Sequence, residues 1–215
     1  MSTACLAAPQ IVTVEEAEEI LGPYRDRLNH CIQHGWDAWK TDYLPKHHIL
    51  GPRSRAAIVF DEIVNRAMEE FSDVPDVKPL RLSNSFMLYI GDRITLRFKK
   101  IKRNGRCSNI HTKQQVLFLA QAQMRLPTML DGTLVHAGYT LDDLQQEVLR
   151  KTVVCQLHNH VLWQLSLSGD TAAIVEFVPA EPLAPTGSTD VRPRFVLKPE
   201  LVEDLPAAKI AGQEE

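Results

Sequence analysis

The spacing of the apolar residues changes after the turn-rich segment 72–79, and this change is the strongest constraint on the fold. Before it, apolar residues such as Leu28 and Ile32 recur every three or four positions, as on one face of a helix. After it, residues such as Leu96 and Phe98 alternate with polar ones, as in a strand with one buried face. We therefore expect an α+β fold in which N-terminal helices precede a mostly antiparallel curved sheet with one or two inserted helices.

Helices are expected before the sheet and once within it. The first begins at Thr13, because Thr13 and Glu16 have the spacing of a capping box. The second begins at Pro23, since proline is favoured in the first turn of a helix. Thr112 can cap the inserted helix, whose apolar stripe consists of Val116, Leu117, Leu119 and Ala120. The expected N-terminal helices span 13–21, 23–43 and 52–71.

Several segments have the alternation and the β-branched or aromatic content of strands. A hairpin turn at 90–93 and a polar loop at 158–160 separate neighbouring strands, and Asn104-Gly105 indicates another turn. Thr140 and Asp143 have capping-box spacing, which indicates a short helix. The expected strands are 80–83, 85–90, 92–100, 133–139, 147–157, 160–167 and 171–178.

We expect one folded domain between a flexible leader and an extended tail. The leader is 1–12, and the domain is 13–179, with a helical part over 13–72 and a sheet part over 79–179. Six of the 13 prolines fall between residues 179 and 206, which favours an extended tail over 180–215. This tail offers a docking segment for a protein partner or for a second copy of the chain in a homo-oligomer.

The sequence predicts a cytoplasmic protein without a membrane partner. No apolar run approaches the roughly 18 residues that a membrane-spanning helix needs. The N-terminus lacks the basic region of a signal peptide. The four cysteines are far apart and form no CxxC pair, so we expect reduced thiols rather than disulfides.

The net charge of −3 conceals a strong separation of charge along the chain. Residues 80–125 contain ten Lys or Arg residues and a single acid, Asp92, whereas the rest of the chain contains 14 basic and 26 acidic residues. Such segregation is typical of a segment that meets phosphate or an acidic partner. The alternative is that acidic helices of the same chain fold over this segment and neutralise it.

The basic segment is expected to form a strand, a loop and the start of a helix. Helix N-termini attract anions, and arginine binds phosphate through two parallel hydrogen bonds. A solvated hairpin tip is the alternative, but it explains the missing acids poorly. The candidate nucleic-acid-binding residues are Arg97, Lys99, Lys100, Lys102, Arg103, Arg106 and Lys113.

His111 lies beside this basic segment and is the candidate general acid or base. Its imidazole would serve metal-independent RNA cleavage, with Arg97 or Lys99 stabilising the charge that develops at phosphorus. A structural or exposed loop histidine is the alternative. A two-metal nuclease is not expected, because the segment lacks the acids that would hold the metal ions.

His30, His34 and Asp37 recur on one helix face at a spacing that can hold a metal ion. An exposed polar face explains them equally well, and no HExxH motif is present. The chain also lacks a P-loop, a GxGxxG motif and a GxSxG motif. We therefore expect neither a metal nor another cofactor.

The segments "ITLRFKK", "SNIHTKQQVLF", "AGYTLDD" and "VLWQL" together resemble a little-described group of small prokaryotic proteins. These proteins belong to mobile or defence-type gene neighbourhoods, beside helix-turn-helix or peptidase-like regulators. The resemblance covers approximately residues 55–167 and implies a toxin-like or defence component. It supplies no catalytic residues.

The sequence thus predicts a nucleic-acid-binding protein, with RNA expected before DNA. Its wider role would be as the effector of a toxin–antitoxin or phage-defence module. If it is an enzyme, it is expected to be a metal-independent ribonuclease. The alternative is a non-enzymatic protein-interaction component whose basic surface receives an acidic partner.

Overall fold

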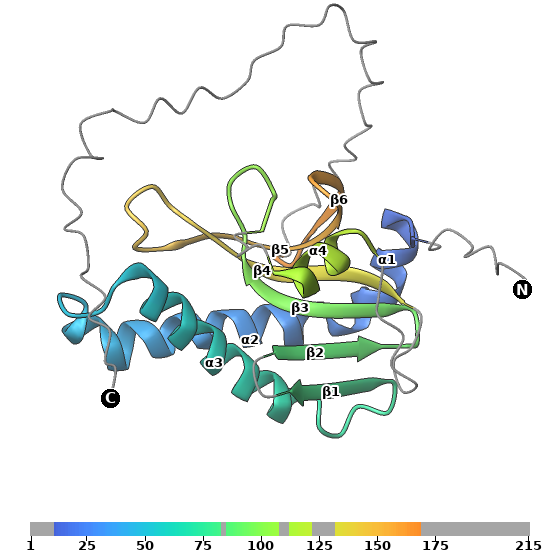
Figure 1. Ribbon diagram of the computed structural model, residues 1–215. Coiled ribbons are helices and arrows are strands. Elements are labelled where there is room, and N and C mark those ends of the chain that lie inside the picture. The colour runs from blue at the N-terminus through green and yellow to red at the C-terminus, as the bar shows by residue number, and fades with distance from the viewer. Residues whose placement is uncertain (1–10, 83–84, 108–111, 122–131, 169–215) are drawn as a thin grey trace, which may run out of the picture. The chain divides into compact units, whose positions relative to one another are not determined.

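The computed structural model describes residues 11–82, 85–107, 112–121 and 132–168. In this part of the chain, helices cover one face of an open six-stranded sheet, so the expected α+β class is confirmed (Figure 1). The helices are α1 (Val14–Leu21), α2 (Arg25–Ala38), α3 (Pro52–Glu70) and α4 (Lys113–Leu119). The strands are β1 (Val77–Leu82), β2 (Ser85–Ile90), β3 (Ile94–Lys100), β4 (Thr133–Leu141), β5 (Val148–Leu157) and β6 (His160–Ser166). None of the described helices has the length and apolar character that crossing a membrane requires.

The six strands are hydrogen-bonded in the order in which they occur in the sequence. Four of the five neighbouring pairs are antiparallel, which confirms the mostly antiparallel sheet. Strands β3 and β4 run parallel, with Arg97 opposite His136. Parallel neighbours need a crossover connection, and the connection between β3 and β4 contains α4.

Helices α2 and α3 pack on the apolar face of the sheet. Trp36 of α2 lies 5.8 Å, between ring centroids, from Tyr139 of β4. A Cβ atom at Gly35 would lie 2.4 Å from Cγ1 of Ile63, so glycine allows α2 and α3 to approach closely. Each large apolar side chain that is fully buried here stabilises the fold by about 1.5–3 kcal/mol. The inward residues of β3 that complete this core are Ile94, Leu96 and Phe98.

Residues 11 and 12, expected in the leader, lie against the sheet. The Val12 amide donates a hydrogen bond to Thr133 Oγ1 at 2.9 Å, and the Trp163 indole donates to the Val12 carbonyl oxygen at 3.0 Å. The Val12 side chain is buried. The strand expected at 171–178 and the tail expected at 180–215 lie outside the described residues.

Helix α4 lies on the other face of the sheet and buries a different side from its apolar stripe. Gln115 and Phe118 are buried, whereas Val116 is 52% exposed. The apolar stripe read from the sequence therefore does not coincide with the buried side of the helix. The reason is that α4 packs on polar side chains of β3 and β4, so its burial follows their positions.

The capping signals read at Thr13 and Thr112 are confirmed. Thr13 Oγ1 accepts a hydrogen bond from the Glu16 amide at 3.3 Å, and Glu16 Oε2 accepts one from the Thr13 amide at 2.9 Å. Thr112 Oγ1 accepts from the Gln115 amide at 3.2 Å and caps α4. Local side-chain chemistry therefore fixes where these two helices begin.

The short helix expected after Thr140 is wrong. Thr140 lies within β4, where it pairs with β5. The Asp142 carboxylate accepts hydrogen bonds from the amides of Gln146 at 2.6 Å and Glu147 at 3.2 Å. These bonds close a β4–β5 hairpin, which shows that the capping-box spacing here belongs to a turn.

The Gln121 side chain joins β4 to β5 beyond the last pair of their backbone ladder, Val135 and Cys155. Its Nε2 donates to the carbonyl oxygens of Leu134 at 2.8 Å and of Gln156 at 2.9 Å. Its Oε1 accepts from the Leu134 amide at 2.8 Å. The side-chain amide of Gln121 thus takes the place of a further backbone pair between the two strands. These hydrogen bonds are needed because the region around the buried Gln121 is shielded from water.

We predict that Gln121→Ala lowers the free energy of unfolding by about 3 kcal/mol or more, because each buried group left unsatisfied costs about 1–3 kcal/mol. Urea unfolding followed by circular dichroism measures this loss. Gln114→Ala, at an exposed position of α4, is the matched control and should change stability by less than about 0.5 kcal/mol. Equal effects of the two substitutions would contradict the bridging role of Gln121.

Candidate functional site

Strand β3 divides the basic segment between the two faces of the sheet. Side chains alternate along a strand, so Arg97 and Lys99 leave on one side and Phe98 and Lys100 on the other. Phe98 belongs to the apolar core beneath α2 and α3, whereas Arg97 contacts α4. The seven candidate residues therefore do not form one continuous surface. Lys113, the last of them, is exposed at the start of α4.

The loop after β3 carries three exposed basic residues, Lys102, Arg103 and Arg106. The Lys102 amide donates to the Arg106 carbonyl oxygen at 2.8 Å, and the Gly105 amide donates to the Lys102 carbonyl oxygen at 3.0 Å. Gly105 has a φ of +75°, a conformation that favours glycine. The turn expected at Asn104-Gly105 is therefore confirmed, and it presents the basic side chains at the end of the sheet.

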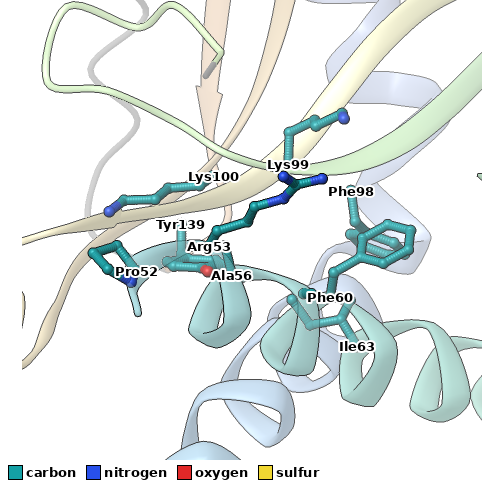
Figure 2. Close-up of a pocket in the computed structure, with 10 residues that line it drawn as sticks. Pro52, Arg53, Ala56, Phe60, Ile63, Phe98, Lys99, Lys100 and Tyr139 are labelled. Carbon is teal, nitrogen blue, oxygen red and sulfur yellow. The ribbon is translucent and has the colours of Figure 1, made fainter. Parts of the chain in front are cut away.

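A cavity of about 510 Å³ lies between the first turns of α3 and the ends of β3 and β4 (Figure 2). Figure 2 shows Arg53 reaching from α3 toward β3, with Lys100 extending from β3 toward the start of α3. None of the residues that line the cavity is acidic. Its basic lining residues are Arg53, Lys99 and Lys100, and its aromatic ones are Phe60, Phe98 and Tyr139.

Positive charge is concentrated around this cavity. Burial lowers the pKa of Lys99 and that of Lys100, and the nearby Arg55 lowers the pKa of Lys100 further. The first turn of α3 contains no acid, and its N-cap, Gly51, makes no side-chain hydrogen bond to the free amides. Arg55 donates to the Gln145 carbonyl oxygen at 3.2 Å, and Lys100 Nζ donates to Gln145 Oε1 at 3.2 Å. A neutral side chain thus holds these two cations, and it leaves their charge uncompensated.

Acids of the same chain neutralise only part of the basic segment. Arg103 Nη2 lies 2.8 Å from Asp143 Oδ1, and Arg93 Nη2 lies 2.7 Å from Glu16 Oε1. Both pairs are solvent-exposed, and exposed ion pairs are weak. Among the described residues, no acid forms a salt bridge with the other candidates, which are Arg97, Lys99, Lys100, Lys102, Arg106 and Lys113.

On the opposite face of the sheet, Arg97 is buried without an acidic partner in the described part of the chain. The side chain is 8% exposed, and its Nε has no hydrogen-bond partner. Its Nη2 lies 3.8 Å from Met87 Sδ, and its Cζ lies 4.5 Å from the centroid of the Phe118 ring. Burial lowers the pKa of Arg97, as expected for a cation removed from water.

His136 lies beside Arg97 and is also buried without a hydrogen-bond partner on either ring nitrogen. Burial, followed by the charges of Lys99 and Arg97, lowers the pKa of His136 to about 3. The ring is therefore neutral at pH 7. Phe118 covers it, with the two ring centroids 4.6 Å apart.

The sequence did not single out His136, because one histidine in an alternating segment makes no motif. Its position in the alternating pattern of β4 could have indicated its role. This position places His136 on the same face of the sheet as Arg97 and Lys99 when β3 pairs with β4. His111 lies outside the described residues. The structure therefore places Arg97 and Lys99 beside His136 and gives no geometry for His111.

The helix face considered for a metal ion makes ordinary polar contacts. His30 Nδ1 lies 2.9 Å from Glu70 Oε1, and Gln33 donates to Asp37 Oδ1 at 2.8 Å. Nδ1 of His34 is buried without a partner. Within the described ranges, no group of three or more His, Cys, Asp or Glu side chains is arranged to hold a metal ion.

The described cysteines are not disposed for thiolate chemistry. Cys31, Cys107 and Cys155 are all buried and free. Burial raises the pKa of each thiol to about 12, so each is protonated at neutral pH. They act as small apolar side chains within the fold.

The chain matches no protein-family model, no curated protein and no solved structure in the comparisons made with known proteins. The proposals that follow therefore rest on geometry and charge. They concern two regions on opposite faces of the sheet, the cavity beside α3 and the polar residues beneath α4.

We predict that the buried His136 makes the protein less stable as the pH falls. A histidine in the unfolded chain has a pKa of about 6.5, so between that value and about 3 the unfolded state binds a proton that the folded state excludes. From pH 7 to pH 5 the loss amounts to about 2 kcal/mol. Urea unfolding in phosphate-free buffer at these two pH values measures it.

His136→Leu should abolish most of this pH-dependent loss, whatever its effect on stability at pH 7. His48→Leu, at an exposed position, is the control and should keep the loss. The same pH dependence in wild type and His136→Leu would show that His136 is not held in its neutral form.

Proposed function

We propose that the protein binds RNA through the basic end of its sheet, defined as Arg53, Lys100, Lys102, Arg103 and Arg106. The observation that carries this proposal is the cavity of about 510 Å³, to which Arg53 and Lys100 bring positive charge and whose lining includes aromatic residues and no acidic one. Its size lies in the range of about 300–1,000 Å³ that is usual for small-molecule sites. A nucleotide unit matches both its charge and its apolar character.

The two kinds of lining residue suit the two parts of a nucleotide. Arg53 and Lys100 offer charged donors to a phosphate, while the partly exposed Phe60 offers aromatic surface to a base. Single-stranded RNA presents unstacked bases, which a duplex does not. Single strands are therefore the preferred ligand in this proposal.

The exposed loop extends the phosphate-binding surface beyond the cavity. Lys102 and Arg106 are exposed, with no acidic partner among the described residues. They would neutralise phosphates of nucleotides that flank the one in the cavity, which makes affinity depend steeply on salt. A role as the effector of a toxin–antitoxin or phage-defence module is proposed separately from this geometry, on the sequence resemblance of residues 55–167 alone.

A protein partner with an acidic surface is the second candidate, because exposed apolar side chains accompany the basic residues. Leu144, in the β4–β5 hairpin, is 75% exposed, and Ile49, before α3, is 70% exposed. An ion pair of 2.6 Å between Glu147 and Lys40 ties this hairpin to the turn after α2. Apolar residues beside a charged rim are usual at protein interfaces.

We predict that charge reversal in the exposed loop weakens RNA binding and its dependence on salt. A plot of log affinity against log salt has a negative slope. For Lys102→Glu with Arg106→Glu, the magnitude of this slope should decrease by about 1.4, because each phosphate neutralised on a single strand contributes about 0.7. Fluorescence anisotropy with labelled single-stranded RNA, duplex RNA and duplex DNA at several salt concentrations measures this change. A gel of the recovered RNA tests for cleavage in the same samples.

The matched control is Lys78→Glu with Arg81→Glu, which changes the net charge equally at exposed positions of β1. The control should bind RNA with the wild-type salt slope, to within the smaller effect of net charge. No binding by wild type at low salt, or an equal loss in both variants, would contradict the proposed surface. A loop variant that binds RNA normally but loses an acidic protein partner would favour the second candidate.

A further inference from the structure

The face of the sheet beneath α4 holds a group of buried polar side chains with unsatisfied hydrogen-bonding atoms. We call Arg97, His136, Thr95, Thr152 and Gln115 the Arg97 cluster. Arg97 Nε, both His136 nitrogens, both threonine hydroxyls and Gln115 Nε2 are buried without a hydrogen-bond partner among the residues that the structure describes. Native proteins rarely leave buried polar atoms unpaired, so a concentration of them points to a missing partner.

The strand pairing brings these residues together. Arg97 lies opposite His136 in the parallel pair of β3 and β4, and Thr95 precedes Arg97 by two residues on the same face. Thr152 of β5 pairs with Gly138, two residues beyond His136 on the same face of β4. Gln115 reaches this face from α4. The unpaired atoms therefore come from three adjacent strands and the helix above them.

The charge of the cluster identifies the kind of partner. Arg97 brings a positive charge into a site where it is 92% buried, and no acid of the described chain pairs with it. An uncompensated buried charge is costly, whereas a bound anion would pair with it. The neighbouring Lys99 adds positive charge and is only partly buried, so it connects the cluster with solvent.

We infer that the Arg97 cluster binds a phosphate group. The Arg97 guanidinium and the Gln115 amide are able to donate hydrogen bonds, and they reach this face from β3 and from α4. A phosphate group offers several acceptor oxygens in a tetrahedral arrangement, which suits donors on more than one side. Free phosphate and the terminal phosphate of a nucleic acid share this chemistry.

This site is separate from the basic end proposed to bind RNA. The alternation of β3 places Arg97 on the α4 face, whereas Phe98 and Lys100 border the cavity on the α3 face. Figure 2 shows the Lys99 side chain leaving β3 on the side away from α3. Either site can therefore fail experimentally without the other.

The first experiment measures the melting temperature of the full chain with inorganic phosphate and with sodium chloride at equal ionic strength. Phosphate at about ten times its dissociation constant should raise the melting temperature of wild type by about 3–6 °C, since a ligand that binds only the folded state stabilises it. Arg97→Met should lose this shift. Lys102→Met, in the exposed loop, should keep it, because Lys102 belongs to the basic end.

The second experiment measures phosphate binding on wild type, and a variant serves only to assign the resonances. In ¹⁵N-labelled protein, the ring nitrogens of His136, assigned by comparison with His136→Leu, should shift when inorganic phosphate is added. RNA with a 5′-phosphate and the same RNA with a 5′-hydroxyl form the second arm. If only the 5′-phosphorylated RNA displaces inorganic phosphate from the site, the ligand is the terminal phosphate of a nucleic acid. If neither RNA displaces inorganic phosphate, the ligand is free phosphate.

The site is supported if phosphate raises the melting temperature of wild type and does not raise that of Arg97→Met. This holds whether the RNA experiment indicates free phosphate or a nucleic-acid terminus as the ligand. The proposal is overturned if phosphate changes neither the melting temperature of wild type nor the His136 resonances. It is also overturned if Arg97→Met shows the same phosphate effect as wild type. Buried water would then be the remaining partner for these atoms.

Discussion

The parallel pairing of β3 with β4 is the constraint on which the rest of the structure depends. It aligns Lys99 with Gly138, and a Cβ atom at Gly138 would lie 1.6 Å from the Lys99 carbonyl oxygen. Only glycine therefore permits this close approach. The pairing also joins two antiparallel hairpin regions into one sheet, and each side of that sheet receives a different helix cover.

This pairing converts one basic segment into two chemically different regions. On the α3 side, Lys100 is only partly buried, and in the loop beyond it Lys102 is exposed, so both charges are accessible to a polyanion. On the α4 side, Arg97 is covered by Phe118 and brought beside His136, where charge is costly and calls for a specific partner. The proposed RNA-binding surface and the proposed phosphate site follow from this division of one basic segment between two environments.

The local parts of the fold could be predicted from the sequence, because local side-chain chemistry decides them. The Thr13 cap and the Gly105 turn depend on neighbours a few residues away, and both are confirmed. The parallel partner of β3 and the buried face of α4 could not be predicted, because they depend on contacts between distant segments. The same distinction applies to the candidate sites. The alternation of β3 predicts which face Arg97 occupies. The contributions of His136 and Arg53 depend on strand pairing and helix packing, which the sequence did not reveal.

Hydrogen–deuterium exchange of the full chain with and without single-stranded RNA tests the central claim most directly, because it locates the bound ligand without changing any residue. RNA should slow exchange in peptides that cover the start of α3, which lines the cavity, and the loop at 101–107, which follows the lining residue Lys100. Peptides from β1, at the far edge of the sheet, should be unaffected. Protection confined to β1 and β2, or no protection at an RNA concentration that saturates the anisotropy signal, would contradict the assignment of the basic end as the RNA-binding surface.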